Sequence, residues 1–249
     1  MIAASSRTVV EPTGAPLNAF ARRALAALDE IEIRAVGAGE DREELLRFRY
    51  DCYRAAGHVA DCPTGKVEDA YDDAPGALRF ALVHRDRIVS SVRLNFVTRD
   101  ERRAMSVATF PDVLNPMLDI GFTMIDPTRF TIDPAVSRDL PALPYLTLRI
   151  ATVAAIHFSP DYVLSLVRPT HVAFYQRVFS AAKLADTREC KSVNFPVCLH
   201  ATDIPLSLPD ICRKYPFFHA LEEERLALFG AVPEVTRRVR PTARAALDA

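Results

Sequence analysis

The sequence predicts a mixed α/β fold in which an antiparallel meander is followed by a parallel crossover, with helices flanking the sheet. Two neighbouring runs, Leu78–His84 and Arg87–Val97, have the residue pattern of a hairpin that turns near Arg85-Asp86. A central strand at Met124–Asp133 is followed by an apolar helix and a buried strand, which is the order of a parallel crossover. Nearly half of the 249 residues are hydrophobic, enough for one large core.

The other expected elements follow from the spacing of apolar residues. Three- and four-residue steps predict helices, and alternating or short continuous runs predict strands. The expected helices are Leu17–Leu28, Asp41–Ala56, Leu146–Phe158, Thr170–Ala182 and Pro209–Phe229, and the further strands are Glu30–Val36, Asp161–Val167 and Asn194–Ala201. Asp41 and Thr170 are expected N-caps, and Gly57 is an expected C-cap.

Segments at both ends are expected to lie outside the main domain. Met1–Pro16 is expected to be a flexible lead-in and Arg237–Ala249 a loose tail. Ala104–Leu118 is expected to be irregular around a short helix, because Pro111 and Pro116 interrupt it. The predicted division is an N-terminal extension and helix at 1–30, the α/β domain at 31–205, and a C-terminal helix and tail at 206–249.

Composition limits the classes of function. The chain has 31 basic and 32 acidic residues, so a general nucleic-acid binder, which is usually strongly basic, is not expected. No apolar run reaches the ~18 residues of a membrane span, and the first residues lack the pattern of a secretory signal. The five cysteines include no C-x-x-C pair, and the histidines form no metal-ligand pattern. We expect a cytoplasmic protein with reduced thiols and no metal.

The central strand, Met124–Asp133, combines a strand pattern with charged residues. Arg129 lies in its middle, where an arginine is costly to bury unless a partner pairs it. Asp126 lies three residues earlier, and Pro127 cannot donate to a strand ladder. An irregularity at Pro127 would turn Asp126 and Arg129 to one side of the sheet. A structural ion pair at a strand end fits this pattern as well as a functional site does.

Two further stretches carry polar residues that fit either a surface or a site. Ser91, Arg93 and Asn95 share one face of the second hairpin strand, as a solvent-facing band or as the floor of a polar cleft. The run Glu68–Asp73 holds acids around one tyrosine. Such a run is typical of a solvated loop, although it can also form a pocket for a cation.

Several common catalytic motifs are absent. The chain has only eight glycines, and they form no G-x-G-x-x-G, no G-x-x-x-x-G-K-[ST] and no G-x-S-x-G. The common nucleotide-dependent enzymes and serine hydrolases are therefore disfavoured.

Four short motifs remain, in the order Arg49-x-x-x-Tyr53, Val67–Asp72, Val89–Leu94 and Asp126–Phe130. In order and approximate spacing they resemble those of the acyl-homoserine-lactone synthases and the N-acyl amino acid synthases, which share the GCN5-related N-acetyltransferase (GNAT) fold. The family patterns are Arg-x-x-x-aromatic, Glu-x-Asp-x-aromatic-Asp, Val-x-x-x-Arg-Leu and Glu-x-Ser-Arg-Phe. The later segment Arg168–Tyr175 is more similar to the N-acyl amino acid synthases.

The resemblance implies acyl transfer from a thioester to an amine. Asp126 would take the proton of the attacking amine, directly or through water, because only the unprotonated amine attacks. Backbone N–H groups of a bulge at Pro127-Thr128 would hold the oxyanion, and Tyr175 would protonate the departing thiolate. The implied catalytic residues are Asp126, Arg129, Arg93 and Tyr175, and the implied substrate-binding residues are Arg49, Tyr53, Asp69, Asp72 and Thr128.

The charged residues of these motifs have two implied roles each. Arg93 and Arg129 would organise the acids or bind a carboxylate of the acceptor through bidentate hydrogen bonds. Asp69 and Asp72 would hold the acceptor amine or order the preceding helix through Arg49.

Departures from the family pattern concern the donor and the base. Asp126 replaces the usual Glu and Thr128 the usual Ser, and Val136–Pro144 replaces the glycine loop that holds coenzyme A pyrophosphate. The resemblance then implies an acyl carrier protein, rather than acetyl-coenzyme A, as donor, a small amine or amino acid as acceptor, and no tightly bound cofactor. Candidate basic docking patches for the carrier protein are Arg99, Arg102 and Arg103, or Arg168, Arg177 and Lys183; both are equally typical of solvated loops.

Three alternatives stay open. An acyl-homoserine-lactone synthase would use S-adenosylmethionine, for which aromatic stacking is frequent, and this chain has no tryptophan. A coenzyme A-dependent acetyltransferase is disfavoured by the missing glycine loop. A catalytically silent module of the same fold is the third alternative, because of the Glu-to-Asp change at Asp126. The helix Leu146–Phe158 and the strand at Tyr162–Leu166 are either the wall of an acyl tunnel or simply core.

Overall fold

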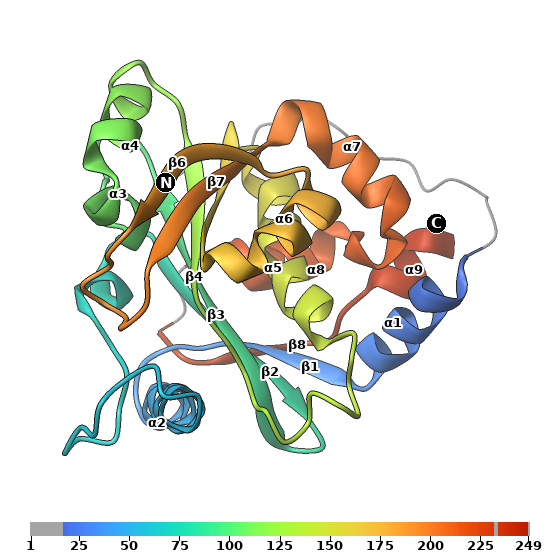
Figure 1. Cartoon of the computed structure of the whole chain (residues 1–249). Coiled ribbons are helices and arrows are strands. Elements are labelled where there is room, and N and C mark those ends of the chain that lie inside the picture. Colours follow the sequence, from blue (N-terminus) through green and yellow to red (C-terminus); the bar gives the residue numbers. More distant parts are fainter. Residues whose placement is uncertain (1–16, 232–233, 249) are drawn as a thin grey trace.

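An eight-stranded mixed sheet runs through residues 17–231 and 234–248, the part of the chain that this computed structural model describes (Figure 1). The strands are β1 (Ile31–Ala35), β2 (Ala77–His84), β3 (Arg87–Val97), β4 (Met124–Ile132), β5 (Tyr162–Val167), β6 (Ala182–Arg188), β7 (Val197–Asp203) and β8 (Arg237–Val239). Their order across the sheet is β6-β7-β5-β4-β3-β2-β1-β8. Strands β1 to β4 pair antiparallel, and β4 and β5 are parallel. The predicted meander and parallel crossover are confirmed.

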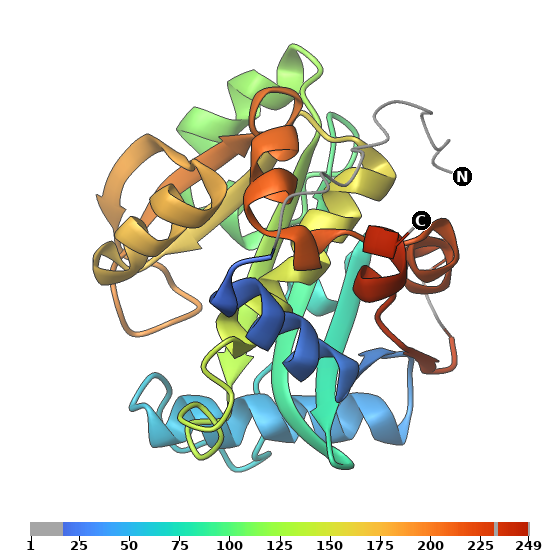
Figure 2. The ribbon, with the colours of Figure 1, turned by 90° about the vertical axis from the view of Figure 1, so that its right-hand side faces the viewer.

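Helices cover both faces of this sheet, with α2 on one face and α1, α5 and α8 on the other (Figures 1 and 2). The helices are α1 (Ala19–Asp29), α2 (Glu40–Ala55), α3 (Met105–Thr109), α4 (Pro111–Asp119), α5 (Leu143–Phe158), α6 (Val172–Phe179), α7 (Ile204–Lys214), α8 (Glu222–Phe229) and α9 (Ala243–Asp248), with short 3₁₀ turns η1 (Ala70–Asp73), η2 (Pro169–His171) and η3 (Pro216–Phe218). Across residues 17–231 and 234–248, no helix is both long and apolar enough to cross a bilayer.

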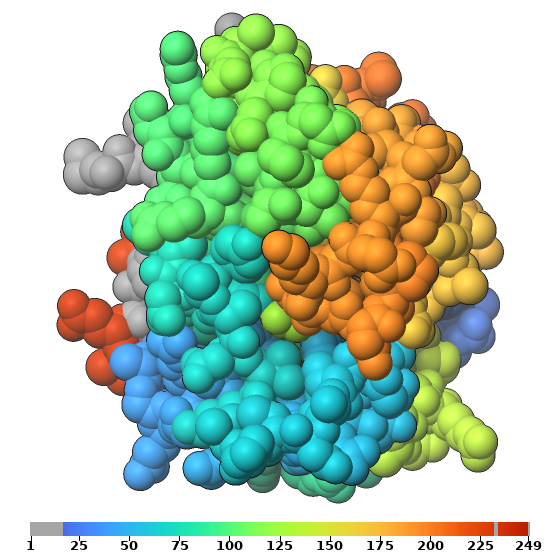
Figure 3. Space-filling model, turned by 60° about the vertical axis from the view of Figure 1, so that its left-hand side comes forward, coloured from blue at the N-terminus to red at the C-terminus, as the bar shows by residue number. Residues whose placement is uncertain are grey.

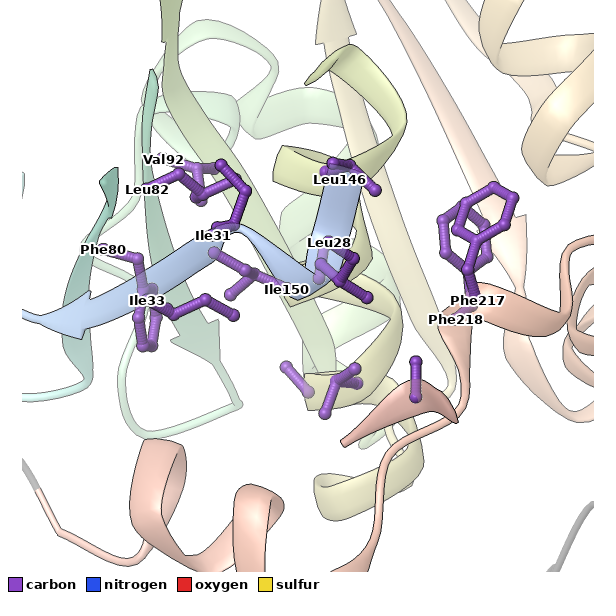
Figure 4. Close-up of a cluster of buried hydrophobic side chains, with 14 of the residues drawn as sticks. Leu28, Ile31, Ile33, Phe80, Leu82, Val92, Leu146, Ile150, Phe217 and Phe218 are labelled. Atoms are coloured by element: carbon purple, nitrogen blue, oxygen red, sulfur yellow. The ribbon is translucent and has the colours of Figure 1, made fainter. Parts of the chain in front are cut away.

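The main core lies between the sheet and the helices of the α5 face (Figure 4). Phe80 and Leu82 of β2 point to it, whereas their neighbours Ala81 and Val83 pack with Leu45 of α2 on the other face, as strand alternation requires. The flanking segments also supply buried side chains to this core, among them Leu25, Leu28, Phe217, Phe218, Leu228 and Val239. The predicted division into segments 1–30, 31–205 and 206–249 stays a prediction. In the structure, side chains from all three segments pack in the same core.

The C-terminal part differs most from expectation. The single helix predicted at Pro209–Phe229 is instead α7, η3 and α8. Helix α7 ends before Pro216, as the restriction on the residue preceding a proline favours, and η3 then places two phenylalanines in the core. The expected loose tail contains β8, which pairs with β1, and α9. Hydrogen bonding to a strand far away in sequence, rather than any local pattern, orders this segment.

Local signals at helix ends were partly wrong. Asp41 lies in the first turn of α2, whose N-cap is Gly39, and Thr170 lies in η2 before α6 begins. Gly57 follows α2 with a φ of 68°, so its predicted role at the helix end is sound. The helix predicted to reach Ala182 ends at Phe179, and Ala182 instead begins β6, a strand that was not predicted. The predicted lead-in Met1–Pro16 lies outside the described residues.

Candidate active site

A cavity of about 300 Å³ lies where β4 and β5 separate. The two parallel strands pair only at Met124–Tyr162 and Ile125–Val163. Beyond these pairs each strand lines one side of the cavity. Apolar side chains of α5, α6 and α7 close it, including Leu148, Ala151, Ala155, Tyr175, Phe179, Ile204 and Leu208. Residues of α5 both line this cavity and pack in the main core, and a role of the cavity as an acyl tunnel stays a prediction.

A β-bulge lies in β4 at the edge of this cavity. Ser91 pairs with Thr131 and Arg93 with Thr128, so Arg129 and Phe130 together stand opposite one residue of β3. Arg129 has a φ of 53°, a conformation that is strained for a residue with a side chain. The bulge predicted at Pro127-Thr128 was therefore placed too early.

Pro127 itself stays in the ladder, opposite Leu94. The carbonyl of Thr123 accepts hydrogen bonds from the β5 side, at the N–H groups of Asp161 and Tyr162. Backbone groups two residues apart point the same way along a strand, so position 127 faces the edge from which β5 has departed. A proline there removes no ladder hydrogen bond, which explains why the strand tolerates it.

The carboxylate of Asp69 joins the bulge to β3. It accepts hydrogen bonds from Arg93 Nη1 at 2.6 Å, and from Arg129 Nε at 3.1 Å and Nη2 at 2.5 Å. Arg93 also donates through Nε to the Thr128 hydroxyl at 3.2 Å. Burial raises the pKa of Asp69, but the charges of Arg93 and Arg129 outweigh burial, so its pKa is lowered. Asp69 is therefore an ionised anchor for both arginines.

The carboxylate of Asp72 ties α2 to the same group. Its Oδ1 accepts from Arg49 Nη1 at 2.9 Å, and its Oδ2 lies 3.0 Å from Arg93 Nη1. Asp69 and Asp72 also form a capping box around η1. Burial opposes ionisation, but Arg49 and Arg93 lower the pKa of Asp72 as well. The solvated-loop interpretation of this acidic run was wrong for Asp69 and Asp72, whereas Asp73 is exposed.

We call Arg49, Arg93, Arg129, Asp69 and Asp72 the cavity network. Three arginines and two aspartates leave it one positive charge in excess. Arg49 is fully buried, yet its Nε and Nη2 have no hydrogen-bond partner among the residues that the structure describes. Arg129 borders the cavity, with its guanidinium 5.8 Å from the centroid of the Tyr53 ring. The network is thus incompletely satisfied and opens to the cavity at Arg129.

Asp126 lies behind this arrangement and is fully buried. Its Oδ1 accepts from the hydroxyl of Ser106 at 2.6 Å and its Oδ2 from the N–H of Ser106 at 3.0 Å. Burial raises the pKa of Asp126, against the hydrogen bonds from Ser106 and the charge of Arg93. The structural ion pair between Asp126 and Arg129 does not form. Ser106, in the first turn of α3, was not identified from the sequence, because nothing local links it to β4.

Most other predicted site residues line the cavity. Thr128, Tyr53 and Tyr175 all contribute to the lining. Burial raises the pKa of Tyr175, so its hydroxyl keeps its proton. In β3 the polar band is buried, which excludes the solvent-facing interpretation, and Asn95 donates to the carbonyl of Tyr71.

The loop after α2 meets the loop before β7 above the cavity. The Asn194 amide donates to the carbonyl of Gly57 at 2.8 Å. In Figure 3 the cyan segment after α2 adjoins the orange segment before β7, and yellow-green atoms show in a recess between them. These two loops form the rim of the cavity.

The fold is GNAT-like, as the sequence predicted, and the family to which the chain is matched is one of acyltransferases. The model of the family "N-acyl amino acid synthase FeeM" matches residues 44–203, more than half of the chain, and this chain belongs to that family. It is an acyltransferase enzyme. No curated protein matches it in sequence.

Solved structures agree on the fold. FeeM, an N-acyl amino acid synthase from uncultured soil microbes, superposes with a TM-score of 0.61 at 16% identity, covering 71% of this chain and 93% of that chain. BjaI, a coenzyme A-dependent acyl-homoserine lactone synthase, gives 0.54 at 17% identity, covering 84% and 92%. The acyl-homoserine-lactone synthase LasI gives 0.50 at 12% identity, covering 82% and 95%.

Proposed function

We propose that this enzyme transfers a fatty acyl group from an acyl carrier protein to the amine of an amino acid. The observation that carries the proposal is the apolar cavity, which begins at the bulge of β4 and borders the cavity network at Arg129. An apolar chamber suits an acyl chain, and charged groups at one end suit a polar acceptor.

The bulge suits stabilisation of the tetrahedral intermediate. It takes Arg129 and Phe130 out of the β3–β4 ladder at the cavity edge. Fixed backbone N–H groups are effective donors to a developing oxyanion, because they need no reorganisation during the reaction. We assign this role to the bulge at Arg129 and Phe130.

Proton transfer requires a base and an acid. Asp69 is a poor base, because Arg93 and Arg129 lower its pKa and occupy both of its carboxylate oxygens. Asp126 has the raised pKa that suits a base, but it is buried behind the cavity wall, so it would receive the amine proton through water. Tyr175 keeps its proton and would donate it to the departing thiolate.

The remaining residues would position these groups. Arg93 is fully buried, and its N–H groups contact Asp69, Asp72 and Thr128. It would therefore organise the site rather than bind substrate. The Arg49–Asp72 pair would hold α2, and with it Tyr53, against the cavity.

The donor is inferred from the first turn of α5. Tyr145 and Leu146 both donate their N–H to the carbonyl of Ala142, Leu143 donates to Leu140, and Pro144 has no N–H. A helix N-terminus binds a pyrophosphate through free N–H groups, and these are absent or occupied. This favours a carrier-protein thioester over coenzyme A. The five free cysteines fit the reducing cytoplasm, where we place the enzyme.

The test is product analysis with purified enzyme. Acyl thioesters from octanoyl to palmitoyl, on acyl carrier protein or on coenzyme A, would be combined with the twenty amino acids. We expect N-acyl amino acids in the carrier-protein reactions, formed about 10²–10⁴-fold more slowly by Asp126→Asn. A lactone formed only when S-adenosylmethionine is added would instead identify an acyl-homoserine-lactone synthase. Absence of any product from every donor would favour the silent module.

A further inference from the structure

A second group of basic side chains lines the same cavity at its rim. Arg168 follows β5, His171 ends η2, and His58 lies in the loop after α2. The Arg168 guanidinium lies 4.2 Å from the centroid of the Phe195 ring, and the His58 ring centroid lies 5.0 Å from the same ring. Three segments that are far apart in sequence therefore converge around Phe195.

This rim group has no acidic partner. Within residues 17–231 and 234–248, none of Arg168, His58 and His171 takes part in a salt bridge, whereas Arg129 on the same cavity is paired with Asp69. Burial lowers the pKa of both His58 and His171, and the charge of Arg168 lowers each further, so the two imidazoles are neutral hydrogen-bonding groups at neutral pH and Arg168 supplies the positive charge. A partly buried arginine beside an apolar cavity, without a counter-charge, is the arrangement expected of a site that receives an anion from its ligand.

The position of Arg168 along β5 limits which anion it can reach. Continued from the Ile125–Val163 pair, the register would set Val167 and Arg168 opposite Arg129 and Phe130; the strands separate before that point, and all four residues line the cavity between them. An anion held by Arg168 would therefore lie beside the bulge, where the thioester is attacked.

We infer that Arg168, assisted by His58 and His171, binds the carboxylate of the acceptor amino acid. This inference rests on the proposed function. The carboxylate of an α-amino acid is one carbon away from the attacking amine, so a site level with the bulge suits it. The phosphodiester of the donor is separated from the thioester by the whole pantetheine arm. The rings of Tyr53, His58 and Phe195 then contact the acceptor side chain.

A binding experiment tests this without requiring turnover. N-dodecanoylglycine and N-dodecanoylglycinamide differ only at the carboxyl end, which is an anionic carboxylate in one and a neutral amide in the other, and glycine is the smallest acceptor. Calorimetric titration should show that the wild-type enzyme binds the acid about ten- to a hundredfold more tightly than the amide, the range for a charge-assisted hydrogen bond. Arg168→Gln should bind the two equally, and Arg168→Lys should retain part of the preference.

Two controls separate carboxylate binding at Arg168 from a general effect of surface charge and from binding of the donor phosphate. Arg47→Gln removes an exposed arginine of α2 and should leave the acid preference intact. Binding of 4′-phosphopantetheine and pantetheine would be compared in the wild-type enzyme and in Arg168→Gln. If Arg168→Gln reduces only the preference for phosphopantetheine, Arg168 serves the donor phosphate and the inference is wrong. An acid preference that is absent in the wild type, or unchanged in Arg168→Gln, also overturns it, whether or not the enzyme forms N-acyl amino acids.

Discussion

The cavity network and the Arg149–Glu224 pair are two buried arginine–carboxylate groups with opposite properties. Arg149 donates to the carbonyls of Phe217 and His219 at 2.7 and 2.6 Å, and to both oxygens of Glu224. Glu224 also accepts from the N–H and the hydroxyl of Thr242 at 2.7 Å. This pair is electrically balanced and fully hydrogen-bonded, whereas the cavity network has excess charge and unpaired donors at Arg49.

We propose that this difference separates a structural role from a functional one. Arg149 and Glu224 join α5, η3 and α8, and both side chains are fully buried. Such a pair holds elements together and has no capacity left for a ligand. The cavity network instead keeps an unbalanced positive charge and reaches the cavity at Arg129, where a substrate can approach it. The comparison predicts that substitutions in the first group change stability and those in the second change activity.

The largest expected effect is on stability, from Arg149→Ala. It leaves Glu224 buried and uncompensated, so the free energy of unfolding should fall by about 3–5 kcal/mol, as measured by urea denaturation. Acyl transfer per folded molecule should not change. The double variant Arg149→Met/Glu224→Leu removes both charges and should recover part of the loss, because the carbonyls of Phe217 and His219 and the N–H of Thr242 stay without these partners. A loss of activity in Arg149→Ala without a loss of stability would contradict the structural role of this pair.

Asp126→Asn should have the largest effect on the rate. Losing a general base lowers acyl transfer by about 10²–10⁴-fold. Stability at neutral pH should not fall, because burial raises the pKa of Asp126. The folded state then binds this proton more tightly than the unfolded chain, so ionisation costs stability as pH rises above the ordinary carboxyl value, and the amide removes that cost. Exposed Asp112→Asn is the control, with thermal unfolding as the stability readout. If Asp126→Asn transferred acyl groups at the normal rate, Asp126 would not be the base, and its role would be limited to holding α3 through Ser106.

Asp69→Asn should affect both properties, with rate dominant. Misplacing Arg93 and Arg129 should slow acyl transfer about a hundredfold, and unfolding should become easier by about 1–2 kcal/mol. The pKa of Asp69 is lowered, so its contribution to stability is present above the ordinary carboxyl value of 3.8 and is lost as pH falls through its lower folded value. Acid unfolding of the variant should therefore depend less on pH. Asp73→Asn, an exposed acid of the same run, should resemble the wild type; an equal effect there would contradict a special role for Asp69.

Ala151→Leu should have the smallest effect and would sharpen the description of the cavity. Ala151 lines it from α5, so a larger side chain shortens the space for an acyl chain. Competition between donors should show preference moving to shorter chains, by about fourfold for each methylene that no longer fits. Unchanged chain-length preference would mean that the acyl group lies elsewhere.

The sequence determined the features that local chemistry controls. Period-2 patterns predicted the hairpin at β2–β3, and helical spacing predicted α2 and α5. Both patterns are visible in the sequence because apolar residues recur with the period of the element whose face they bury. The motifs from Arg49 to Phe130 indicated the family and the residues of the cavity network, and the structure brings Arg49, Asp69, Asp72, Arg93 and Arg129 together.

Only the tertiary structure decided how those residues are paired. The bulge lies at Arg129 and Phe130 because register depends on the partner strand as well as on the proline in β4. Asp126 binds Ser106, and Arg168 lines the same cavity as the bulge, through an arrangement of segments that no local pattern connects. Strand β8 and the turn at η3 likewise exist because distant residues complete their hydrogen bonds and packing. The physical reason is that local patterns fix which face of an element is buried, whereas partners and charge balance arise only when the elements are assembled.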